Sequence, residues 1–281
     1  MAKIIAVANQ KGGVGKTTTS VNLAACLAAA EKRTLLIDFD PQGNGSSCLG
    51  IEKESFKDMN VYHALINEEA FEKCIYQTEL PLLDLCPSNN DLVGAELELV
   101  HMFARESKLK VALEAIQDKY DYIIIDCAPS LNLLTVNAFT AANSYLVPMQ
   151  TEYLAMEGLS QLLNTVRLIR ASLNPKLALE GILLTMYDSR NNLCKLVATD
   201  LQNHFKEEIF KSIIPRNVKL SECTSFGKPI ILYDITSKGS EAYLSLAREI
   251  ILKTEKPSTT SHTKMAINDR IPKFEDYQVN P

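Results

Sequence analysis

The chain has 281 residues, of which 46% are hydrophobic and 22% charged, and this composition is typical of a soluble protein with one large α/β domain. Its formal net charge of −5 excludes a generally basic nucleic-acid-binding protein, so any contact with DNA must come from a local basic patch. The seven cysteines are odd in number and form no C-x-x-C pair, which argues against a disulfide framework or a structural zinc site and favours reduced thiols in a cytoplasm.

Apolar, β-branched runs alternate with helical patterns along the chain. The runs predicted to be buried strands are residues 4–8, 34–37, 82–85, 122–125, 145–147 and 181–184. Helical periodicity is predicted for residues 17–30, 95–117, 133–142, 158–172, 193–205 and 241–253. Near-continuous apolar strands that alternate with helices predict an α/β fold with a doubly wound, mostly parallel sheet flanked by helices.

The last predicted helix has a core-facing stripe, so we expect a single domain over residues 1–253. Residues 254–281 differ in composition from the rest of the chain, with the cluster STTSHT, three prolines and balanced charge. They are predicted to form a poorly ordered tail. The tail lacks the basic face and clustered apolar face of a membrane-targeting helix. No run is long enough to span a membrane, and the first residues lack a signal peptide's pattern, so we expect no membrane association.

A glycine-rich loop, QKGGVGKTT over residues 10–18, lies between the first predicted strand and the first predicted helix. Polyphosphate binding needs backbone N–H groups aimed inward, and glycines allow the backbone to approach closely. The start of the helix adds partial positive charge. The alternative is a glycine-rich turn without a ligand. The predicted nucleotide-binding residues of this loop are Lys11, Gly12, Gly13, Val14, Gly15, Lys16, Thr17 and Thr18.

Three residues of the loop have side chains with predicted roles on ATP and Mg²⁺. Lys16 would neutralise the β and γ phosphates. The Thr17 hydroxyl would ligate Mg²⁺, and Thr18 would donate a hydrogen bond to a phosphate oxygen.

Carboxylates follow two of the predicted strands, at the edge where open parallel sheets bind ligands. Asp38 and Asp40, two residues apart in LLIDFDPQGN, are predicted to lie on one side of an extended chain. Asp40 would position the attacking water, and Asp38 would support Lys16 or the magnesium shell. Asp126, at the end of YIIID, would bind Mg²⁺ through water. For both motifs the alternative is a strand-end turn without a metal role.

Lys11 stands five residues before Lys16 in KGGVGKT, and this arrangement resembles the deviant Walker A motif. The resemblance implies a lysine that reaches across a dimer interface onto the partner's nucleotide, where it stabilises charge on the transferring phosphoryl group. Lys11 would then be catalytic together with Lys16 and Asp40. A side chain at Gly12 would hold the two protomers apart. The alternative for Lys11 is an ordinary solvated lysine.

Between about Lys3 and Lys253 the chain resembles the ParA/Soj family of chromosome and plasmid partition ATPases, in its short form without an N-terminal DNA-reading domain. The segments that carry the resemblance are KGGVGKTTTSVNLAACLA at 11–28, LLIDFDPQGN at 35–44, YIIIDCAPSL at 122–131, EYLAMEGLSQLLNTVRLI at 152–169, LLTMYDSRNNL at 183–193, IPRNVKLSE at 214–222 and GKPIILYD at 227–234. It implies an ATP-dependent homodimer on the nucleoid that binds double-stranded DNA without sequence preference. A ParB-type centromere-binding partner would trigger hydrolysis.

The resemblance also implies roles for residues near the carboxyl-terminal end. DNA contacts are expected at Arg190 and at Lys219, where the family pattern leads us to expect arginine, so the charge survives but a bidentate fork does not. The adenine pocket would include Pro215 and Asn217. Weaker candidates for the DNA face are Arg216, Lys195 and Lys238. Without the family, each of these cations is an ordinary solvated residue.

Two other functions share the phosphate loop. A MinD-type membrane-surface ATPase that positions cell division would need a short amphipathic anchor, which the sequence does not show. A nitrogenase-reductase-like electron carrier would need paired cysteines that bridge an iron–sulfur cluster. Cys127 is in a possible position for such a ligand, but a convincing second cysteine is missing, and Cys127 is interpreted as a small buried hydrophobic residue.

Overall fold

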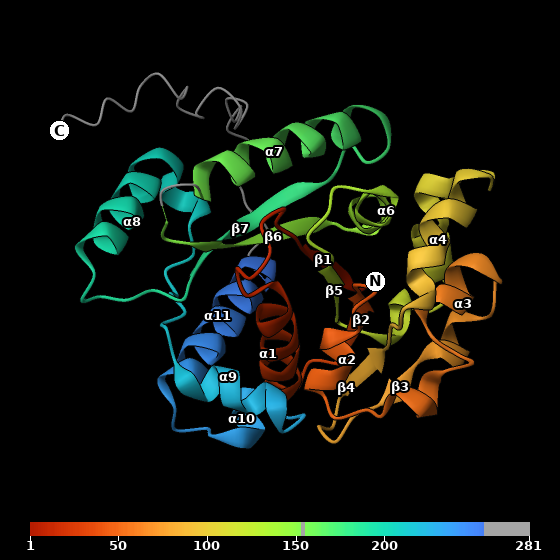
Figure 1. Ribbon diagram of the computed structural model, residues 1–281, viewed down its shortest axis with the longest axis horizontal. Helices are drawn as coiled ribbons and strands as arrows, with labels where there is room; N and C mark the ends of the chain where they lie inside the picture. The colour runs from red at the N-terminus through yellow and green to blue at the C-terminus, as the bar shows by residue number, and fades with distance from the viewer. Residues whose placement is uncertain (153–154, 256–281) are drawn as a thin grey trace.

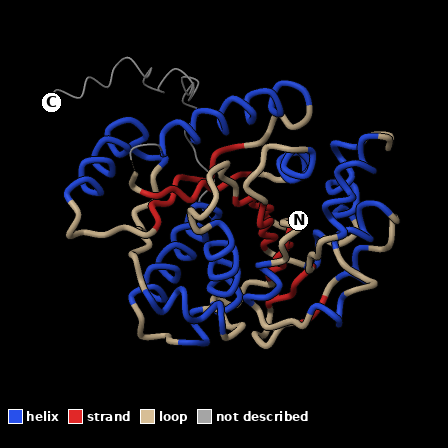
Figure 2. The backbone as a smooth tube through the Cα atoms, in the orientation of Figure 1, coloured by secondary structure: helices blue, strands red, loops and turns tan. Residues whose placement is uncertain are grey.

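The computed structural model describes residues 1–152 and 155–255, and the predicted tail therefore lies almost wholly outside the described residues. One sheet, in the order β3-β4-β2-β5-β1-β6-β7, runs through the middle of the molecule (Figures 1 and 2). All its strand pairs are parallel except β3 with β4. The strands are β1 (Lys3–Val7), β2 (Thr34–Phe39), β3 (Tyr76–Gln77), β4 (Leu83–Cys86), β5 (Tyr122–Cys127), β6 (Ser144–Gln150) and β7 (Ala178–Thr185).

Helices cover both faces of the sheet, as the alternating pattern predicted. They are α1 (Lys16–Ala29), α2 (Asn44–Cys48), α3 (Val61–Ile66), α4 (Asp91–Val100), α5 (Lys108–Glu114), α6 (Leu133–Ala141), α7 (Ala155–Ser172), α8 (Asn192–Phe205), α9 (Val218–Ser225), α10 (Ile230–Tyr233) and α11 (Lys238–Glu255). One core lies between the sheet and α1, α9 and α11, and a second between the sheet and α3 to α8. Within the described ranges, no helix has both the length and the apolar character of a membrane span.

The doubly wound fold and every predicted strand are confirmed, but the single helix predicted for residues 95–117 is wrong. α4 begins at Asp91 and ends at Val100, and α5 begins only at Lys108. Between them Ala104 has a left-handed φ of 51°, which a helix does not tolerate. The Arg105 guanidinium donates to the Val100 carbonyl oxygen at 3.0 Å. It thus gives a hydrogen-bond partner to a carbonyl group in the last turn of α4, where such groups lack a partner within the helix. The apolar periodicity continues through this corner because both helices pack on the same core.

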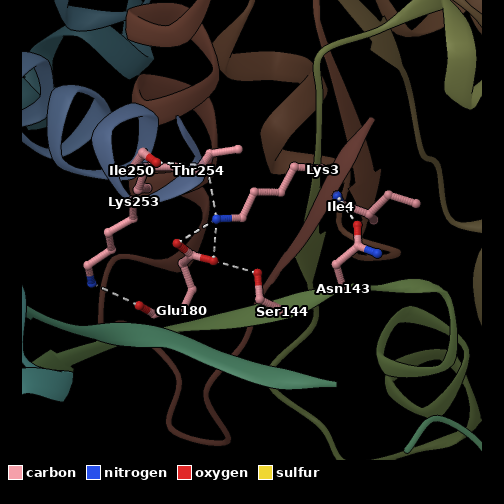
Figure 3. A network of polar contacts seen from close by, with 8 residues as sticks. All are labelled: Lys3, Ile4, Asn143, Ser144, Glu180, Ile250, Lys253 and Thr254. Atoms are coloured by element: carbon pink, nitrogen blue, oxygen red, sulfur yellow. Dashed lines mark hydrogen bonds and ion pairs between the residues drawn. The ribbon is translucent and has the colours of Figure 1, made fainter. Parts of the chain in front are cut away.

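Polar side chains tie together the amino ends of β1, β6 and β7 (Figure 3). The Lys3 ammonium lies 2.8 Å from both carboxylate oxygens of Glu180, and the Ser144 hydroxyl donates to the same carboxylate at 2.7 Å. Lys3 also donates to the hydroxyl of Thr254, and Lys253 donates to the Glu180 backbone oxygen, so the end of α11 is fastened to the sheet. Within this network the charge of Lys3 is balanced by Glu180, whose carboxylate also accepts from Ser144, as buried polar groups require.

Candidate functional site

The phosphate loop and the three predicted carboxylates meet at the carboxyl edge of the sheet (Figure 1). β5 lies between β1, which leads into the loop, and β2. The register of β2 and β5 places Asp38 opposite Asp126. The parallel sheet therefore gathers side chains that are far apart in the sequence, at the edge where ligands bind in such folds.

The backbone of the loop uses conformations that favour glycine. Gly13 and Gly15 have φ values of 72° and 85°, in the left-handed region that other residues seldom adopt. Within residues 1–152 and 155–255, a Cβ atom built on Gly12 or Gly13 would meet nothing within 4 Å. Beside these glycines the loop therefore borders open space and not packed protein.

Polar residues at the ends of β6 and β7 brace this loop. The Gln150 side chain donates to the Gly13 carbonyl oxygen at 3.0 Å, and the Thr185 hydroxyl donates to that of Val14 at 2.8 Å. Asn9 accepts a hydrogen bond from the backbone at the loop's start and donates one to β6. Sequence reasoning missed these residues, and their only signal was a polar side chain at the end of an apolar strand.

Lys16 is folded back over the loop and is 7% exposed. Its ammonium donates to the Lys11 backbone oxygen at 3.0 Å. Burial lowers the pKa of Lys16, whereas attraction to the negative charges of Asp126 and Asp40 acts in the opposite direction. The lysine is held at the loop by a single neutral acceptor, which phosphate oxygens could replace.

Asp126 is fully buried at the end of β5, and one of its oxygens has no hydrogen-bond partner among the described residues. Its Oδ1 accepts a hydrogen bond from the Ser20 hydroxyl at 2.8 Å, while Oδ2 accepts none. Burial raises the pKa of Asp126, the charge of Asp38 raises it further, and the nearby Thr17 and Ser20 hydroxyls oppose the rise. An unpaired buried carboxylate oxygen close to a threonine hydroxyl fits a hydrated Mg²⁺ ion.

The residues present do not fit a metal ion that is held by protein side chains alone. In the described ranges, no group of three or more His, Cys, Asp or Glu side chains could hold a metal ion. Mg²⁺ typically takes one or two carboxylates together with substrate phosphates and water, which matches the residues present. Cys127, next to Asp126, is buried in β5 within the apolar core.

Asp38 is also fully buried, but its carboxylate is engaged. Its Oδ2 accepts hydrogen bonds from the backbone N–H and the hydroxyl of Ser46, both at 2.7 Å. Burial raises the pKa of Asp38, and the hydrogen bonds from Ser46 oppose this rise. Among the described contacts, no hydrogen bond or ion pair joins Asp38 to Lys16. In this structure the bonds from Ser46 hold the start of α2 against Asp38, and they thereby fix the turn between Asp40 and α2.

Asp40 is 7% exposed and occupies the turn between β2 and α2. Its Oδ1 accepts a hydrogen bond from the Gln42 backbone N–H at 2.9 Å. Its negative charge acts against the lowering of the Lys16 pKa by burial, so the two groups lie near each other.

Lys11 lies at the mouth of the loop with its side chain 37% exposed. Its ammonium forms an ion pair of 2.5 Å with Glu152, a side chain that is itself 53% exposed. An exposed ion pair of this kind contributes little stability, about 0–1 kcal/mol. Lys11 is therefore held loosely within its own chain.

The predicted DNA-contacting cations are exposed, and two of them pair with carboxylates of their own chain. Both oxygens of Asp188 accept hydrogen bonds from the Arg190 guanidinium, at 2.9 and 2.8 Å. These bonds, together with the charges of Arg190 and Arg216, lower the pKa of Asp188 to about 2. Lys219 is on α9 and pairs with Glu222 at 2.9 Å. Lys195, on α8, and Lys238, at the start of α11, are also exposed.

The two predicted adenine-pocket residues lie beside these cations. Pro215 is half-buried and forms a parallel bridge with Tyr187. The Asn217 side chain accepts a hydrogen bond from the Lys219 backbone N–H at 2.8 Å and caps α9. The structure thus gives Asn217 a structural role whatever it binds.

Two glycines bring the end of α2 against the end of α9, a contact that the sequence did not reveal. Gly50 and Gly227 have φ values of 71° and 62°. A Cβ on Gly50 would lie 2.9 Å from the Gly227 oxygen, and a Cβ on Gly227 would lie 2.7 Å from the Gly50 Cα. The chain just after α2 therefore packs backbone against backbone on the chain just after α9, the helix that carries Lys219.

Comparison with known sequences identifies similar proteins over most of the chain. A family model described as an AAA domain matches residues 2–179. The chromosome partitioning protein ParA of Myxococcus xanthus is 54% identical over 92% of this chain and 91% of its own length. The sporulation initiation inhibitor protein Soj of Bacillus subtilis is 56% identical over 89% and 98%. The chromosome-partitioning ATPase Soj of Treponema pallidum is 46% identical over 90% and 98%.

Solved structures share the fold. A cobyrinic acid a,c-diamide synthase from Mycobacterium smegmatis with bound ADP and magnesium is 35% identical over 92% of this chain and all of its own, with a TM-score of 0.80. A plasmid partition protein from Borrelia burgdorferi bound to AMPPNP is 28% identical over 90% and 100%, with a TM-score of 0.77. The cell division ATPase MinD of Pyrococcus furiosus is 27% identical over the same shares, with a TM-score of 0.74.

Proposed function

Since the chain belongs to the ParA/Soj family of chromosome-partitioning ATPases, we propose that ATP binding and hydrolysis switch it between a DNA-bound dimer and a released form. The names of its relatives favour partitioning over the MinD-type membrane-surface function, although a MinD structure shares the fold. The observation that carries the nucleotide part of the proposal is the buried, unpaired Oδ2 of Asp126 beside the phosphate loop.

In this proposal the loop binds the phosphates of ATP. The backbone of Gly12 to Gly15 faces the phosphates, and Lys16 exchanges its bond to the Lys11 oxygen for bonds to phosphate oxygens. Thr17 and Asp126 hold the hydrated magnesium ion. Bound Mg²⁺ would supply charge neutralisation for the phosphates. Solved relatives of this fold with ADP or an ATP analogue and magnesium support this assignment.

Two carboxylates then have separate roles. Asp40 is nearly buried at the same edge of the sheet, and it would accept a hydrogen bond from the attacking water and orient it. Asp38 would act one step away, because its bonds to Ser46 fix the turn that carries Asp40. We therefore assign Asp38 to positioning and not to direct contact with Lys16.

Lys11 would complete the site of a second protomer. The open space beside Gly12 leaves room for another chain to approach the loop, since none of the described residues lies within 4 Å of a Cβ there. The Lys11–Glu152 pair is exposed and weak, so Lys11 can leave it for the more strongly charged phosphates of a partner's nucleotide. Nucleotide state would then control dimer formation.

DNA binding would follow from dimer formation. Arg190, Arg216 and Lys219 are exposed, but Arg190 and Lys219 are partly neutralised by carboxylates of their own chain. Each protomer therefore offers only a weak basic patch on a chain of net charge −5. Two patches joined in one dimer bind a polyanion far more tightly than one, through effective concentration. The contact is electrostatic and should weaken steeply with salt.

The remaining parts of the proposal concern partners and place. By its family, the chain would act in the cytoplasm on nucleoid DNA, and a ParB-type centromere-binding protein would stimulate hydrolysis. After hydrolysis the γ-phosphate no longer holds Lys11 of the opposite protomer, so the dimer loosens and leaves the DNA.

Retention of the purified protein on non-specific double-stranded DNA tests this switch. We expect strong retention with ATP and Mg²⁺ at about 50 mM salt, little with ADP, and a large loss by about 200 mM salt. The Lys11→Ala variant should lose ATP-dependent dimer formation and retention. Lys32→Ala, which removes an exposed lysine paired with Glu255, is the matched control and should behave as the parent. Equal retention with ATP and ADP would refute the switch.

The same assay separates the roles of the carboxylates. Asp40→Ala should bind ATP and remain on DNA, because the nucleotide is held but its hydrolysis is slowed by about 10²–10⁴-fold. Phosphate release measured in parallel gives the rate, and rapid turnover in this variant would contradict the role proposed for Asp40.

A further inference from the structure

The outer face of α4 carries apolar side chains that the fold does not cover. Val93, Leu97 and Val100 are 58%, 75% and 49% exposed, and Phe103, just beyond the helix, is 93% exposed. Their spacing of four and three residues places the three helical side chains on one face. We call these four residues the α4 stripe.

The α4 stripe is not needed to attach the helix to its own domain. The opposite face of α4 is buried through Leu92, Ala95 and Leu99, which pack in the core beside α3 and α6. Figure 1 shows α4 at one end of the molecule, with no element beyond it among the described residues. A helix that is apolar on both faces is ordinarily buried on both. Clustered exposed apolar residues on a folded domain mark an interaction site.

The acidic side chains of α4 lack cationic partners. Asp91 accepts a hydrogen bond from Asn89 at 2.9 Å, and Glu98 accepts one from the Tyr62 hydroxyl at 3.1 Å. Glu96 accepts one from the Asn132 side chain. All three donors are neutral, and across residues 1–152 and 155–255 no ion pair involves these carboxylates.

In contrast to the acidic side chains of α4, those of the neighbouring segment around residues 68–72 form ion pairs. Glu68, Glu69 and Glu72 each pair with a lysine. The helix itself, Asp91–Val100, contains no lysine or arginine. The α4 stripe is therefore accompanied by carboxylates that form no ion pair with the part of the chain that the structure describes.

We propose that the α4 stripe is a docking surface for a cationic amphipathic segment of a protein partner. The apolar face of such a segment would cover the stripe, and its lysines or arginines would meet Asp91, Glu96 and Glu98. An anionic membrane would be repelled by the same carboxylates. A second copy of this chain, packed through the same face, would bring like charges together.

The docking surface is joined to the segment that follows Asp126. Asn132 donates to Glu96 and also caps α6, where its side chain accepts a hydrogen bond from the Thr135 backbone N–H at 3.2 Å. The Thr135 hydroxyl in turn donates to the Ser130 carbonyl oxygen. A cation that takes Glu96 from Asn132 would therefore act on the stretch between β5 and α6. The docking proposal itself does not depend on the proposed DNA switch.

A labelled synthetic peptide tests the surface directly. The probe is an 18-residue helix former with leucines on one face and lysines beside them, and its fluorescence anisotropy is followed on titration with the full chain. We expect binding that falls about tenfold or more in Leu97→Asp. The matched control is Leu168→Asp on α7, because Leu168 is similarly exposed at 65% and lies outside α4; it should bind as the parent.

Two further peptides isolate charge from apolar contact. A peptide with glutamate in place of lysine should not bind, and a scrambled peptide of the original composition should bind much more weakly. Equal affinity of Leu97→Asp and the parent, or equal binding of the glutamate peptide, would overturn the proposal. So would α4-dependent sedimentation with vesicles of anionic lipid, or an α4-dependent dimer in light scattering without nucleotide, since these results would assign the stripe to a membrane or to a second copy.

Discussion

The two edges of the central sheet carry polar residues of opposite character. At the amino edge, Lys3, Glu180 and Ser144 satisfy one another, and the network also fastens α11 (Figure 3). At the carboxyl edge, Asp38 and Asp126 stand opposite each other in neighbouring strands, and an oxygen of Asp126 is left without a partner. Both edges are buried, so the difference lies in whether charges are balanced within the chain.

The difference shows what each edge contributes. A balanced network stabilises the fold in every state of the protein, because it needs nothing from outside. Buried carboxylates that outnumber the cations beside them cost free energy until a ligand supplies the missing positive charge. The carboxyl edge is therefore arranged for binding, and the amino edge holds the strands and α11 in place while the ligand comes and goes.

The largest expected effect comes from breaking the balanced edge. Glu180→Ala leaves the Lys3 ammonium and the Ser144 hydroxyl without their partner, and it should lower the free energy of unfolding by about 3 kcal/mol. Chemical denaturation of the nucleotide-free protein measures this loss. Glu255→Ala, which removes the exposed partner of Lys32, is the control and should cost less than about 1 kcal/mol. Similar losses in both variants would mean that the Glu180 network is an ordinary surface pair.

At the carboxyl edge a substitution is expected to raise the free energy of unfolding, not to lower it. Asp126→Asn removes a carboxyl group whose pKa is raised by burial and by the charge of Asp38, which means that folding disfavours its charged form. The nucleotide-free variant should therefore be more stable than the parent by about 1 kcal/mol near neutral pH. The same variant should lose most of the thermal stabilisation that ATP with Mg²⁺ gives the parent, because its amide is a poor magnesium ligand.

The stability difference between Asp126→Asn and the parent should depend on pH, in a direction that follows from the raised pKa of Asp126. An Asp126 pKa that is higher in the folded than in the unfolded chain means that the folded state binds protons more tightly. Stability of the parent should therefore fall, relative to Asp126→Asn, as pH rises from about 4, and the gap should level off above the folded pKa. A gap that narrows with rising pH would show that Asp126 is instead stabilised as a carboxylate.

The smallest expected effect concerns the pair at the loop's mouth. Glu152→Gln releases Lys11 from an exposed ion pair, so the stability of the single chain should change by less than about 0.5 kcal/mol. If Lys11 acts on a second protomer, the free lysine should favour ATP-dependent dimer formation about twofold. Light scattering over a range of protein concentrations measures this shift. Weaker dimer formation would indicate that Glu152 itself belongs to the interface.

Local sequence determined much of the site. Glycines at 13 and 15 are required by left-handed backbone, and the runs that end at Asp38 and Asp126 form strands because apolar, β-branched residues are buried on both faces of a parallel sheet. These features depend on residues close in sequence, which is why they could be predicted. The corner near Ala104 was missed because the same apolar period continues on both sides of it.

What the sequence by itself determined is therefore the order of the elements, the phosphate loop and the carboxylates that follow the strands. Only the tertiary structure decided that Asp38 faces Asp126, that Gln150 and Thr185 brace the loop, and that Lys3 is neutralised by Glu180. Strand order and register set these contacts, and both come from packing between segments far apart in the chain. A side chain's charge is written in the sequence, but whether that charge finds a partner depends on the fold.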